Sequence, residues 1–304
     1  MAPNDGDNPA ELMHNADLAL YAAKADGGGT YRRYDVSLNE KMLERRAIEA
    51  GLRLALAERQ LELYYHPLVN AATKRITSAE ALVRWNHPTR GLVLPSGFIG
   101  IAEETGLILP LGEWVLNAAC AEAVTWPEDI NVAVNLSPVQ FRERSLVNVV
   151  KSTLRSAGLS SERLELEITE GVLLSDEIRT LETLDELKSL GVRISMDDFG
   201  TGYSSLSYLQ KFPFGKIKID QSFVRQVPDD LESAAIVRAI VTMGKCLGMS
   251  TTIEGVETSE QLDFSVAAGC DTIQGYLISR PLDRTGLASL LAAKDNGQIQ
   301  LEAA

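Results

Sequence analysis

Residues that bind metal ions through oxygen recur where short apolar stretches of the chain end. Five such stretches end at or beside an acid or an amide: Asn135, Glu167, Asp197, Asp220 and Glu254. Carboxylates crowded into one low-dielectric site repel one another and are driven toward protonation unless a cation lies between them. A hard divalent cation is the simplest such partner, and an oxygen-only ligand set without His or Cys favours Mg²⁺, Mn²⁺ or Ca²⁺ over zinc.

The adjacent acids Asp197 and Asp198 are the most informative pair. Together they could serve two ions about 3.5–4 Å apart, an arrangement that hydrolyses phosphate esters. Any single acid at a strand end is more often a solvated loop residue or a helix N-cap. Five such strand ends in one chain favour a shared metal site over five unrelated surface residues.

Two strands carry charged residues at a spacing of two. Residues 164–169 alternate with period 2, which places Glu165 and Glu167 on one face of the predicted sheet. The same parity places Lys218 and Asp220 on one face of their strand. These two residues are either a structural ion pair inside the fold or groups that contact phosphate and water.

The segment after the paired acids, Asp198–Leu206, is rich in Gly and Ser. Such a loop is permissive enough to move and to close over a site, although an ordinary turn between a strand and a helix has the same composition. Its Gly-x-Gly pattern alone is weak evidence for phosphate binding.

Short apolar runs alternate with amphipathic helices from Glu62 onward, which is typical of a parallel sheet wrapped by helical crossovers. About eight strands in roughly 215 residues match a (β/α)8 barrel, which carries its chemistry at the carboxyl ends of its strands. The predicted strands are Leu63–Tyr65, Ile76–Val83, Ile130–Leu136, Leu164–Thr169, Arg193–Met196, Lys216–Asp220, Thr251–Glu254 and Thr272–Gln274. The first two are separated by about ten residues, Pro67–Arg75, too few for a helical crossover. We therefore predict an α/β fold, a modified TIM (β/α)8 barrel with an antiparallel first strand.

The segments outside these strands predict helices. Residues 38–61 have no proline and carry apolar residues at helical spacing, as expected of a connecting helix. Ala16–Lys24 predicts a short helix followed by a possible strand at Thr30–Tyr34. Ser175–Leu190 carries an apolar stripe and predicts one of the helices around the barrel.

The composition limits the classes of function. The chain has 304 residues, of which 45% are hydrophobic, and 29 basic against 42 acidic residues give a net charge of −13. This charge argues against binding to bulk nucleic acid or an anionic membrane. Three cysteines without a CxxC pair indicate neither a disulfide framework nor a zinc knuckle. The sequence has no apolar run of about 18 residues and no signal-peptide pattern, so we expect no membrane span and a cytoplasmic location.

The segment Glu80–Trp85, with the sequence EALVRW, resembles the signature of the EAL domain, a bacterial family of cyclic di-GMP phosphodiesterases. The similarity runs from about Leu61 to Leu282, and its ordered set of motifs is highly specific. The matching motifs are Tyr65–Pro67, Phe98–Ile99, Ala102–Gly106, Asn135–Pro138, Glu167–Glu170, Asp197–Gly202, Lys218–Asp220, Glu254–Glu257 and Gln274–Tyr276. Three positions depart from the family pattern, with His66 in place of Gln, Ser78 in place of Gly and Gly100 in place of Pro.

The resemblance implies roles for individual residues. The implied metal-binding residues are Glu80, Asn135, Glu167, Asp197, Asp198 and Asp220, of which Asp198 would bind a second ion. Glu254 resembles the general base, and Lys218 would lie near the attacking water and the scissile phosphate. The implied substrate-binding residues are Arg84, Leu82, Gln274 and His66. Glu170 and Glu257 are expected to anchor the loop at 198–205, which in the family couples dimerisation to metal binding.

The function that the resemblance implies is hydrolysis of cyclic di-GMP to linear pGpG with Mg²⁺ or Mn²⁺, while Ca²⁺ is expected to inhibit. A homodimer through the EAL domain is also implied. A different class remains open, a catalytically silent sensor that binds cyclic di-GMP and acts through a partner. Family members of that class usually lack some of the acids, and this chain has all of them.

The start of the chain resembles the last helix and strand of a GGDEF diguanylate-cyclase domain, through Ala16–Tyr21 and Ala23–Lys24. A generic amphipathic helix is the alternative. The implied segments are a GGDEF remnant (1–37), a linker helix (38–60), the EAL barrel (61–290) and a tail (291–304). Most of the GGDEF domain is absent, so we expect no cyclase activity, and further GGDEF or sensory domains upstream in a longer parent protein.

Overall fold

Eight strands close into a barrel in the part of the chain that the computed structural model describes, residues 5, 7–25, 29–173, 177–201 and 206–293. They are β1 (Leu61–Asn70), β2 (Ile76–His87), β4 (Asn131–Leu136), β5 (Leu164–Thr169), β6 (Arg193–Phe199), β7 (Lys216–Ile219), β8 (Ser250–Ile253) and β9 (Thr272–Ile273). Neighbours follow the order β1-β9-β8-β7-β6-β5-β4-β2, and pairing of β1 with β2 closes the ring. The predicted modified TIM barrel is therefore confirmed.

The first strand is antiparallel to both of its neighbours, whereas the other barrel strands pair in parallel. Residues 71–75 are too few for a helical crossover, so the chain turns directly from β1 into β2. The Asn70 side chain holds this turn by accepting hydrogen bonds from the backbone of Ala72 and Thr73 at 3.1 and 2.8 Å. β1 is longer than predicted, and the short strand β3 (Gly91–Val93), which pairs with the outer end of β2, was not predicted.

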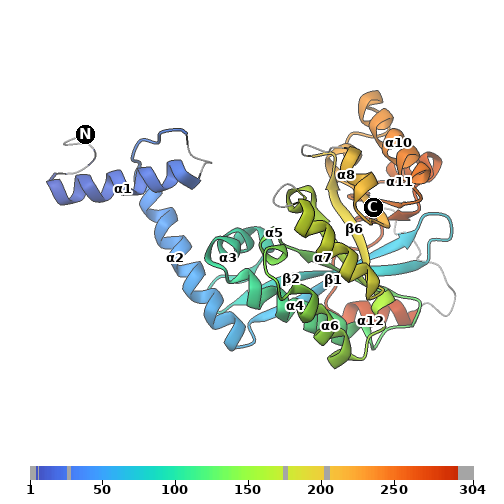
Figure 1. The fold of residues 1–304 in the computed structure, drawn as a ribbon. Helices are drawn as coiled ribbons and strands as arrows, with labels where there is room; N and C mark the ends of the chain where they lie inside the picture. The colour runs from blue at the N-terminus through green and yellow to red at the C-terminus, as the bar shows by residue number, and fades with distance from the viewer. Residues whose placement is uncertain (1–4, 6, 26–28, 174–176, 202–205, 294–304) are drawn as a thin grey trace.

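Helices pack around the outside of the barrel (Figure 1). The helices after β2 are α3 (Ile99–Thr105), α4 (Ile108–Ala123), α5 (Pro138–Phe141), α6 (Leu146–Ala157), α7 (Glu177–Ser189), α8 (Leu206–Lys211), α9 (Gln221–Val224), α10 (Leu231–Cys246), α11 (Ser259–Ala268) and α12 (Arg284–Ala292). The described residues also contain the short 3-10 turns η1 (Pro95–Gly97), η2 (Ser161–Arg163) and η3 (Glu170–Val172). A continuous apolar core fills the space between these helices and the sheet. The predicted helix Ser175–Leu190 corresponds to α7, and its first two residues lie outside the described part of the chain.

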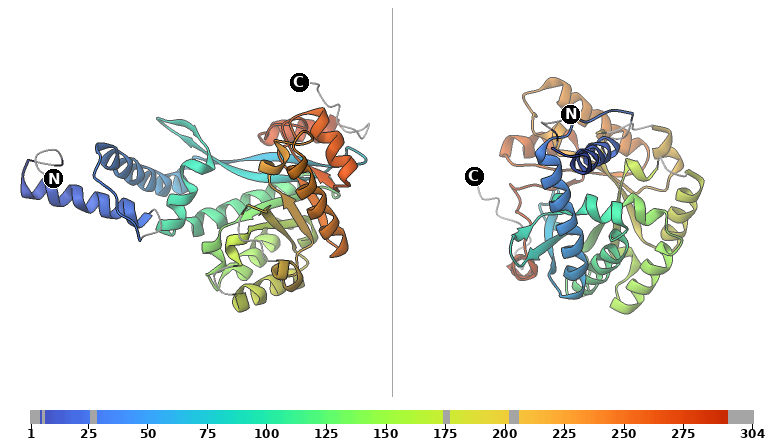
Figure 2. Two further views of the ribbon diagram at one scale, coloured as in Figure 1. Left: turned by 90° about the horizontal axis from the view of Figure 1, so that it is seen from above. Right: turned by 90° about the vertical axis from the view of Figure 1, so that its left-hand side faces the viewer.

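Two helices precede the barrel, α1 (Pro9–Ala25) and α2 (Val36–Ala57). α2 joins the core through Ile48, Leu52 and Ala55. At Gly51 the helix comes so close to the barrel that a Cβ atom would lie 3.0 Å from the indole ring of Trp85. α1 packs against α2 and lies away from the barrel, as Figure 1 and the left view of Figure 2 show.

The predicted strand at Thr30–Tyr34 is wrong, because residues 31–35 have no regular structure. A strand requires a neighbour that pairs with its backbone N–H and C=O groups, and the described residues provide none for this segment. Asp35 instead caps α2, and its carboxylate accepts a hydrogen bond from the backbone of Ser37 at 2.8 Å.

In the described part of the chain, no helix combines the length and the apolar character that a membrane span requires.

The packing of α2 leads to a testable expectation. Leu52→Ala should lower the free energy of unfolding by about 2–5 kcal/mol, because the Leu52 side chain is fully buried against the barrel. Leu54→Ala on the same helix is the matched control and should change it by less than about 0.5 kcal/mol, because Leu54 is 55% exposed. Urea unfolding followed by circular dichroism measures both values. Equal values for the two variants would show that α2 does not dock on the barrel in solution.

Candidate active site

The parallel register brings the acidic strand ends to one rim of the barrel. Asn135 on β4 pairs with Glu167 on β5, and Thr169 at the end of β5 pairs with Asp197 on β6. Glu80 lies one strand further around the ring, where β2 pairs with β4. The predicted convergence of these side chains on the carboxyl-terminal mouth is confirmed.

Lys218 is the centre of this site. Its ammonium nitrogen lies 2.6 Å from Glu254, 2.8 Å from Glu167 and 3.0 Å from Asp197, with Glu80 at 3.9 Å. The lysine side chain is 1% exposed, so one buried cation serves four carboxylates. Burial opposes its charge, yet these four acids raise the pKa of Lys218 well above its usual value.

The ion pair between Lys218 and Asp220 that the sequence left open does not form. Asp220 instead caps α9, where its carboxylate accepts a hydrogen bond from the backbone of Ser222 at 2.9 Å. Asp220 still lies close enough to Asp198 to disfavour its ionisation.

Glu80 is held by two amide side chains. Asn135 donates a hydrogen bond to one of its oxygens at 2.7 Å, and Gln274 donates to the other at 2.8 Å. Burial opposes ionisation of this group, but Lys218 and the two amides together lower the pKa of Glu80. The carboxylate is therefore fixed in position and ionised at neutral pH.

Asp197 and Asp198 face the site together because the strand is irregular between them. Successive residues of a regular strand point to opposite faces, so only one of two adjacent acids would face the mouth. The pairing of β6 with β7 shifts register between Met196 and Phe199, and Asp198 has a left-handed φ of 52°. As a result, ligand oxygens of Asp197, Asp198 and Glu254 all lie within 4.8 Å of one another.

Three of the carboxylates, Glu167, Asp198 and Glu254, resist ionisation in the absence of another cation. Burial is the main cause, and the neighbouring acids add to it. Together they raise the pKa of Glu254 to about 8, that of Asp198 to about 6, and that of Glu167 well above its usual value. A metal-free site of this kind holds protons near neutral pH, and these protons must leave when a cation enters.

A second ion pair lies deeper in the barrel. Lys216 contacts Glu165 at 2.6 Å, one layer below Lys218 and Glu167. Burial opposes ionisation of Glu165, but the contact with Lys216 lowers the pKa of this carboxyl overall. Strand parity predicted that both glutamates lie on one face of the sheet, but the lysine partners could be assigned only from the structure.

The charges inside the barrel fit bound dications. Six carboxylates, Glu80, Glu165, Glu167, Asp197, Asp198 and Glu254, surround two lysines, Lys216 and Lys218. When these acids are ionised, their negative charge exceeds the positive charge of the two lysines, which favours binding of divalent cations. One buried oxygen of Glu167 also has no hydrogen-bond partner among the described residues. The all-oxygen donor set and this unpartnered oxygen fit Mg²⁺ or Mn²⁺.

The loop after the paired acids is tied to the neighbouring strand end. The backbone N–H of Gly200 donates a hydrogen bond to Glu170 at 3.1 Å, and the hydroxyl of Thr201 donates to the Asp198 carbonyl at 2.9 Å. The rest of the predicted mobile loop, residues 202–205, lies outside the described residues. The contact is consistent with an anchoring role for Glu170, which stays a prediction.

A polar cavity of about 280 Å³ opens above the acids. It is lined by all four residues predicted to bind substrate, Arg84, Leu82, Gln274 and His66, and by Glu80 and Glu254. Glu257 also lies on its wall, and the predicted role of Glu257 in anchoring the loop stays a prediction. Burial lowers the pKa of His66, so its imidazole is neutral at pH 7.

Two further residues of this cavity, Gln221 and Arg225, were missed from the sequence. Neither belongs to a strand end, and neither follows a pattern that separates it from an ordinary polar helix surface. No sequence signal that we used could have identified them.

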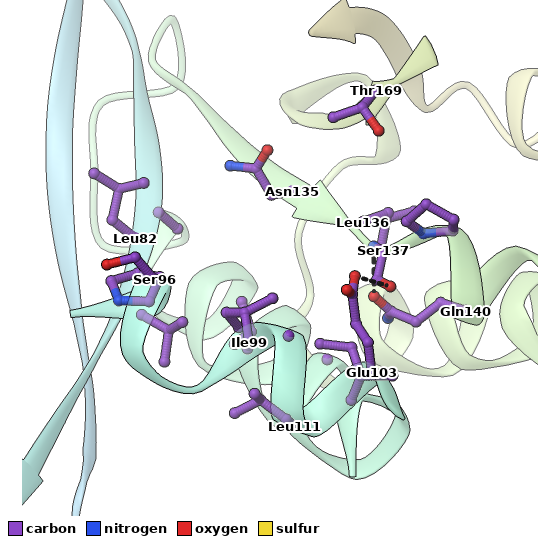
Figure 3. Close-up of a pocket in the computed structure, with 18 residues that line it drawn as sticks. Leu82, Ser96, Ile99, Glu103, Leu111, Asn135, Leu136, Ser137, Gln140 and Thr169 are labelled. Carbon is purple, nitrogen blue, oxygen red and sulfur yellow. Dashed lines mark hydrogen bonds between the residues drawn. The ribbon is translucent and has the colours of Figure 1, made fainter. Parts of the chain in front are cut away.

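A larger cavity of about 510 Å³ lies beside the acidic site, between α3, α4 and the ends of β2 and β4 (Figure 3). Its walls are mainly apolar, with one polar corner. There the Ser137 hydroxyl donates to Glu103 at 2.6 Å, and Gln140 accepts from the Ser137 backbone at 2.9 Å. Asn135 stands at its edge in Figure 3, and the carboxylates around Lys218 do not line it. Cavity size alone would therefore have pointed away from the reactive groups.

The family model described as the EAL domain matches residues 49–281, most of the chain. The chain belongs to the EAL domain family. The name-giving residues of the EAL domain are Glu80, Ala81 and Leu82 on β2, and Glu80 is the residue that Asn135 and Gln274 hold.

Several known proteins are similar to this EAL domain. The chain is 51% identical over 284 residues to the uncharacterised protein y4lL of Sinorhizobium fredii. This match covers 93% of the chain and 34% of that protein. It is 42% identical to the bifunctional diguanylate cyclase/cyclic di-GMP phosphodiesterase MucR of Pseudomonas aeruginosa, over 95% of the chain and 43% of that protein. The chain thus spans less than half the length of these relatives.

Solved structures show the same fold. A structure of the PaMucR phosphodiesterase in complex with c-di-GMP has a TM-score of 0.77 and 43% identity, over 79% of this chain and 99% of that one. The EAL enzyme Bd1971, with cAMP and cyclic di-GMP bound, has a TM-score of 0.80 and 31% identity, over 95% of this chain and 77% of that one.

The raised pKa of Glu254 has a measurable effect on stability in the presence of a chelator. The folded state binds this proton with a pKa of about 8, and the ordinary value is 4.5. The stability that protonation of Glu254 contributes is complete below about pH 4.5 and is lost as the pH rises toward 8. Between about pH 5 and pH 7.5, unfolding free energy should therefore fall more steeply with pH in the wild type than in Glu254→Gln, by up to about 1.4 kcal/mol per pH unit.

The control for this experiment is Glu257→Gln, which makes the same change in an exposed carboxylate of the same cavity. It should keep the wild-type slope. Urea titrations at a series of pH values give the three slopes, and a wild-type slope in Glu254→Gln would refute the predicted protonation.

Proposed function

We propose that this EAL domain is a metal-dependent phosphodiesterase that opens one phosphodiester of cyclic di-GMP and releases linear pGpG. The observation that carries the proposal is the complete acidic set around Lys218 beneath a polar cavity. Relatives that are named as cyclic di-GMP phosphodiesterases support the substrate, and so does the solved complex of a similar EAL domain with c-di-GMP.

Each residue of the site has a part in this proposal. Two Mg²⁺ or Mn²⁺ ions would activate water and offset the charge of the phosphate. The residues that would hold them are Glu80, Asn135, Glu167, Asp197 and Asp198, with Asp220 beside the second ion. Glu254 accepts the proton of the attacking water as general base. Lys218, which already contacts Glu254, stabilises the negative charge that develops on the phosphoryl oxygens. Arg84, Leu82, Gln274 and His66 contact the substrate from the cavity wall.

The bonds exchanged explain the product. The water oxygen bonds to phosphorus, the bond from phosphorus to the 3′ oxygen breaks, and the released 3′ oxygen takes up a proton. The 5′ oxygen stays bonded to phosphorus, so the ring opens to a linear dinucleotide with a 5′-phosphate. The other phosphodiester remains intact.

The proposal also covers the origin of the N-terminal segments and the oligomeric state. The match to the bifunctional relative covers 95% of this chain, whereas the EAL family model begins at residue 49. This difference supports the origin of residues 1–37 from a GGDEF domain, and of residues 38–60 as a linker helix in a longer protein with upstream domains. A homodimer through the EAL domain, whose formation the loop after Asp198 couples to metal binding, completes the proposal.

The function is tested by incubating the purified chain with cyclic di-GMP and Mg²⁺ or Mn²⁺ and by separating the nucleotides chromatographically. The expected product is pGpG, and Ca²⁺ in place of these ions should suppress its formation. Glu254→Gln should lower turnover by at least about 100-fold, because it removes the proton acceptor. Binding of cyclic di-GMP without turnover under either ion would instead indicate a silent sensor.

Asp198→Ala tests the metal-binding part separately. Loss of this negative ligand should weaken metal affinity and turnover together, with activity partly recovered at higher Mn²⁺ concentration. Asp185→Ala removes an exposed acid of α7 and serves as the control. Turnover measured against Mn²⁺ concentration gives both effects, and an unchanged midpoint in Asp198→Ala would contradict the assigned role.

A further inference from the structure

The polar cavity above the acids contains an arginine that the proposed chemistry does not use. Arg225 follows α9 and lines the cavity together with Glu254 and Arg84. Its guanidinium donates one hydrogen bond, to the side chain of Gln221 at 2.9 Å. No carboxylate lies within ion-pair distance of it among the described residues, although the cavity wall is rich in acids.

Close packing fixes the position of this arginine. Gly255 follows Glu254 with a left-handed φ of 70°, and a Cβ atom at Gly255 would lie 2.5 Å from the Cβ of Gln221. The absence of that Cβ lets α9 approach the end of β8. The side chain of Gln261 on α11 also donates a hydrogen bond to the Val224 carbonyl at 3.2 Å. Arg225 is therefore presented from a short helix that is held on two sides.

We infer that Arg225 binds the phosphodiester of the cyclic dinucleotide that is not being cleaved, and that it thereby sets affinity for a substrate with two phosphates. This inference rests on the proposed function.

The charges of the cavity carry the argument. A cyclic dinucleotide brings two separate negative phosphates, and the described lining of the cavity contains two guanidinium groups, Arg84 and Arg225. Arg84 lies on β2, on the same face of the strand as Glu80, and the proposed function already assigns it to the substrate. Arg225 reaches the cavity from α9, beyond Glu254, and is the cation left for the second phosphate. Its planar fork can donate two hydrogen bonds to one phosphate group.

A ligand-based cycle tests the inference without turnover. GpG retains the non-reacting phosphodiester and both guanines, and its methylphosphonate analogue carries the same bases on an uncharged linkage. Calorimetric titration of both ligands in chelator gives their affinities for the wild type and for Arg225→Gln. We expect the wild type to prefer GpG over the analogue by about 10-fold or more, because a hydrogen bond to a charged group contributes about 1.5–3 kcal/mol. In Arg225→Gln this preference should fall to about twofold or less.

Two further variants sharpen the result. Arg225→Lys keeps the charge and should retain part of the preference, whereas Arg155→Gln removes an exposed arginine of α6 and should retain all of it. In turnover assays, Arg225→Gln should raise KM for cyclic di-GMP about 10-fold or more relative to its effect on bis(p-nitrophenyl) phosphate, which has a single phosphate.

The outcomes separate this inference from the proposed function. An undiminished preference for GpG in Arg225→Gln overturns the inference, and so does an equal loss for both ligands, which would mean that Arg225 contacts a guanine. Wild-type protein that fails to hydrolyse cyclic di-GMP but keeps the Arg225-dependent preference overturns the proposed function alone.

Discussion

A single buried ammonium group organises the interior of this barrel. Lys218 is surrounded by carboxylates from β2, β5, β6 and the end of β8. Carboxylates gathered this closely would otherwise be protonated or would force the strands apart. The lysine makes the acidic mouth compatible with a folded barrel, and the charge that it leaves uncompensated creates affinity for further cations.

The lysine is also a constraint on how the site works. A cation that enters must compete with the ammonium group for the same oxygens, so Lys218 limits how many carboxylate lone pairs remain for ligation. The hydrogen bonds from Asn135 and Gln274 to Glu80 have the opposite effect, because they fix one acid that the lysine contacts only weakly, at 3.9 Å. The site is thus divided between an ion-paired half and an amide-supported half.

Much of this arrangement could be predicted from the sequence, because it depends on local features of the chain. Strand parity places Glu165 and Glu167 on one face of their strand, and the short connection after β1 forces a hairpin, so neither depends on distant contacts. The joint orientation of Asp197 and Asp198 depends on an irregular pairing of β6 with β7, which no sequence pattern predicted. The capping role of Asp220 and the placement of Arg225 depend on how α9 packs, which is decided by tertiary contacts around Gly255. The prediction of a strand at residues 30–34 was wrong for the same kind of reason, because a strand requires a neighbouring strand to pair with.

The reversed direction of β1 decides where the chain enters the barrel. In a barrel of uniformly parallel strands, the polypeptide arrives at the face opposite the chemistry. Here Leu61, the first residue of β1, pairs with Trp85 near the carboxyl end of β2, so α2 delivers the chain to the reactive rim itself. Trp85, which packs against α2, lies on the same strand as Glu80 and Arg84. α2 therefore ends at the rim that carries the acids, and its 22 residues lead back from this rim to α1 (Figure 1).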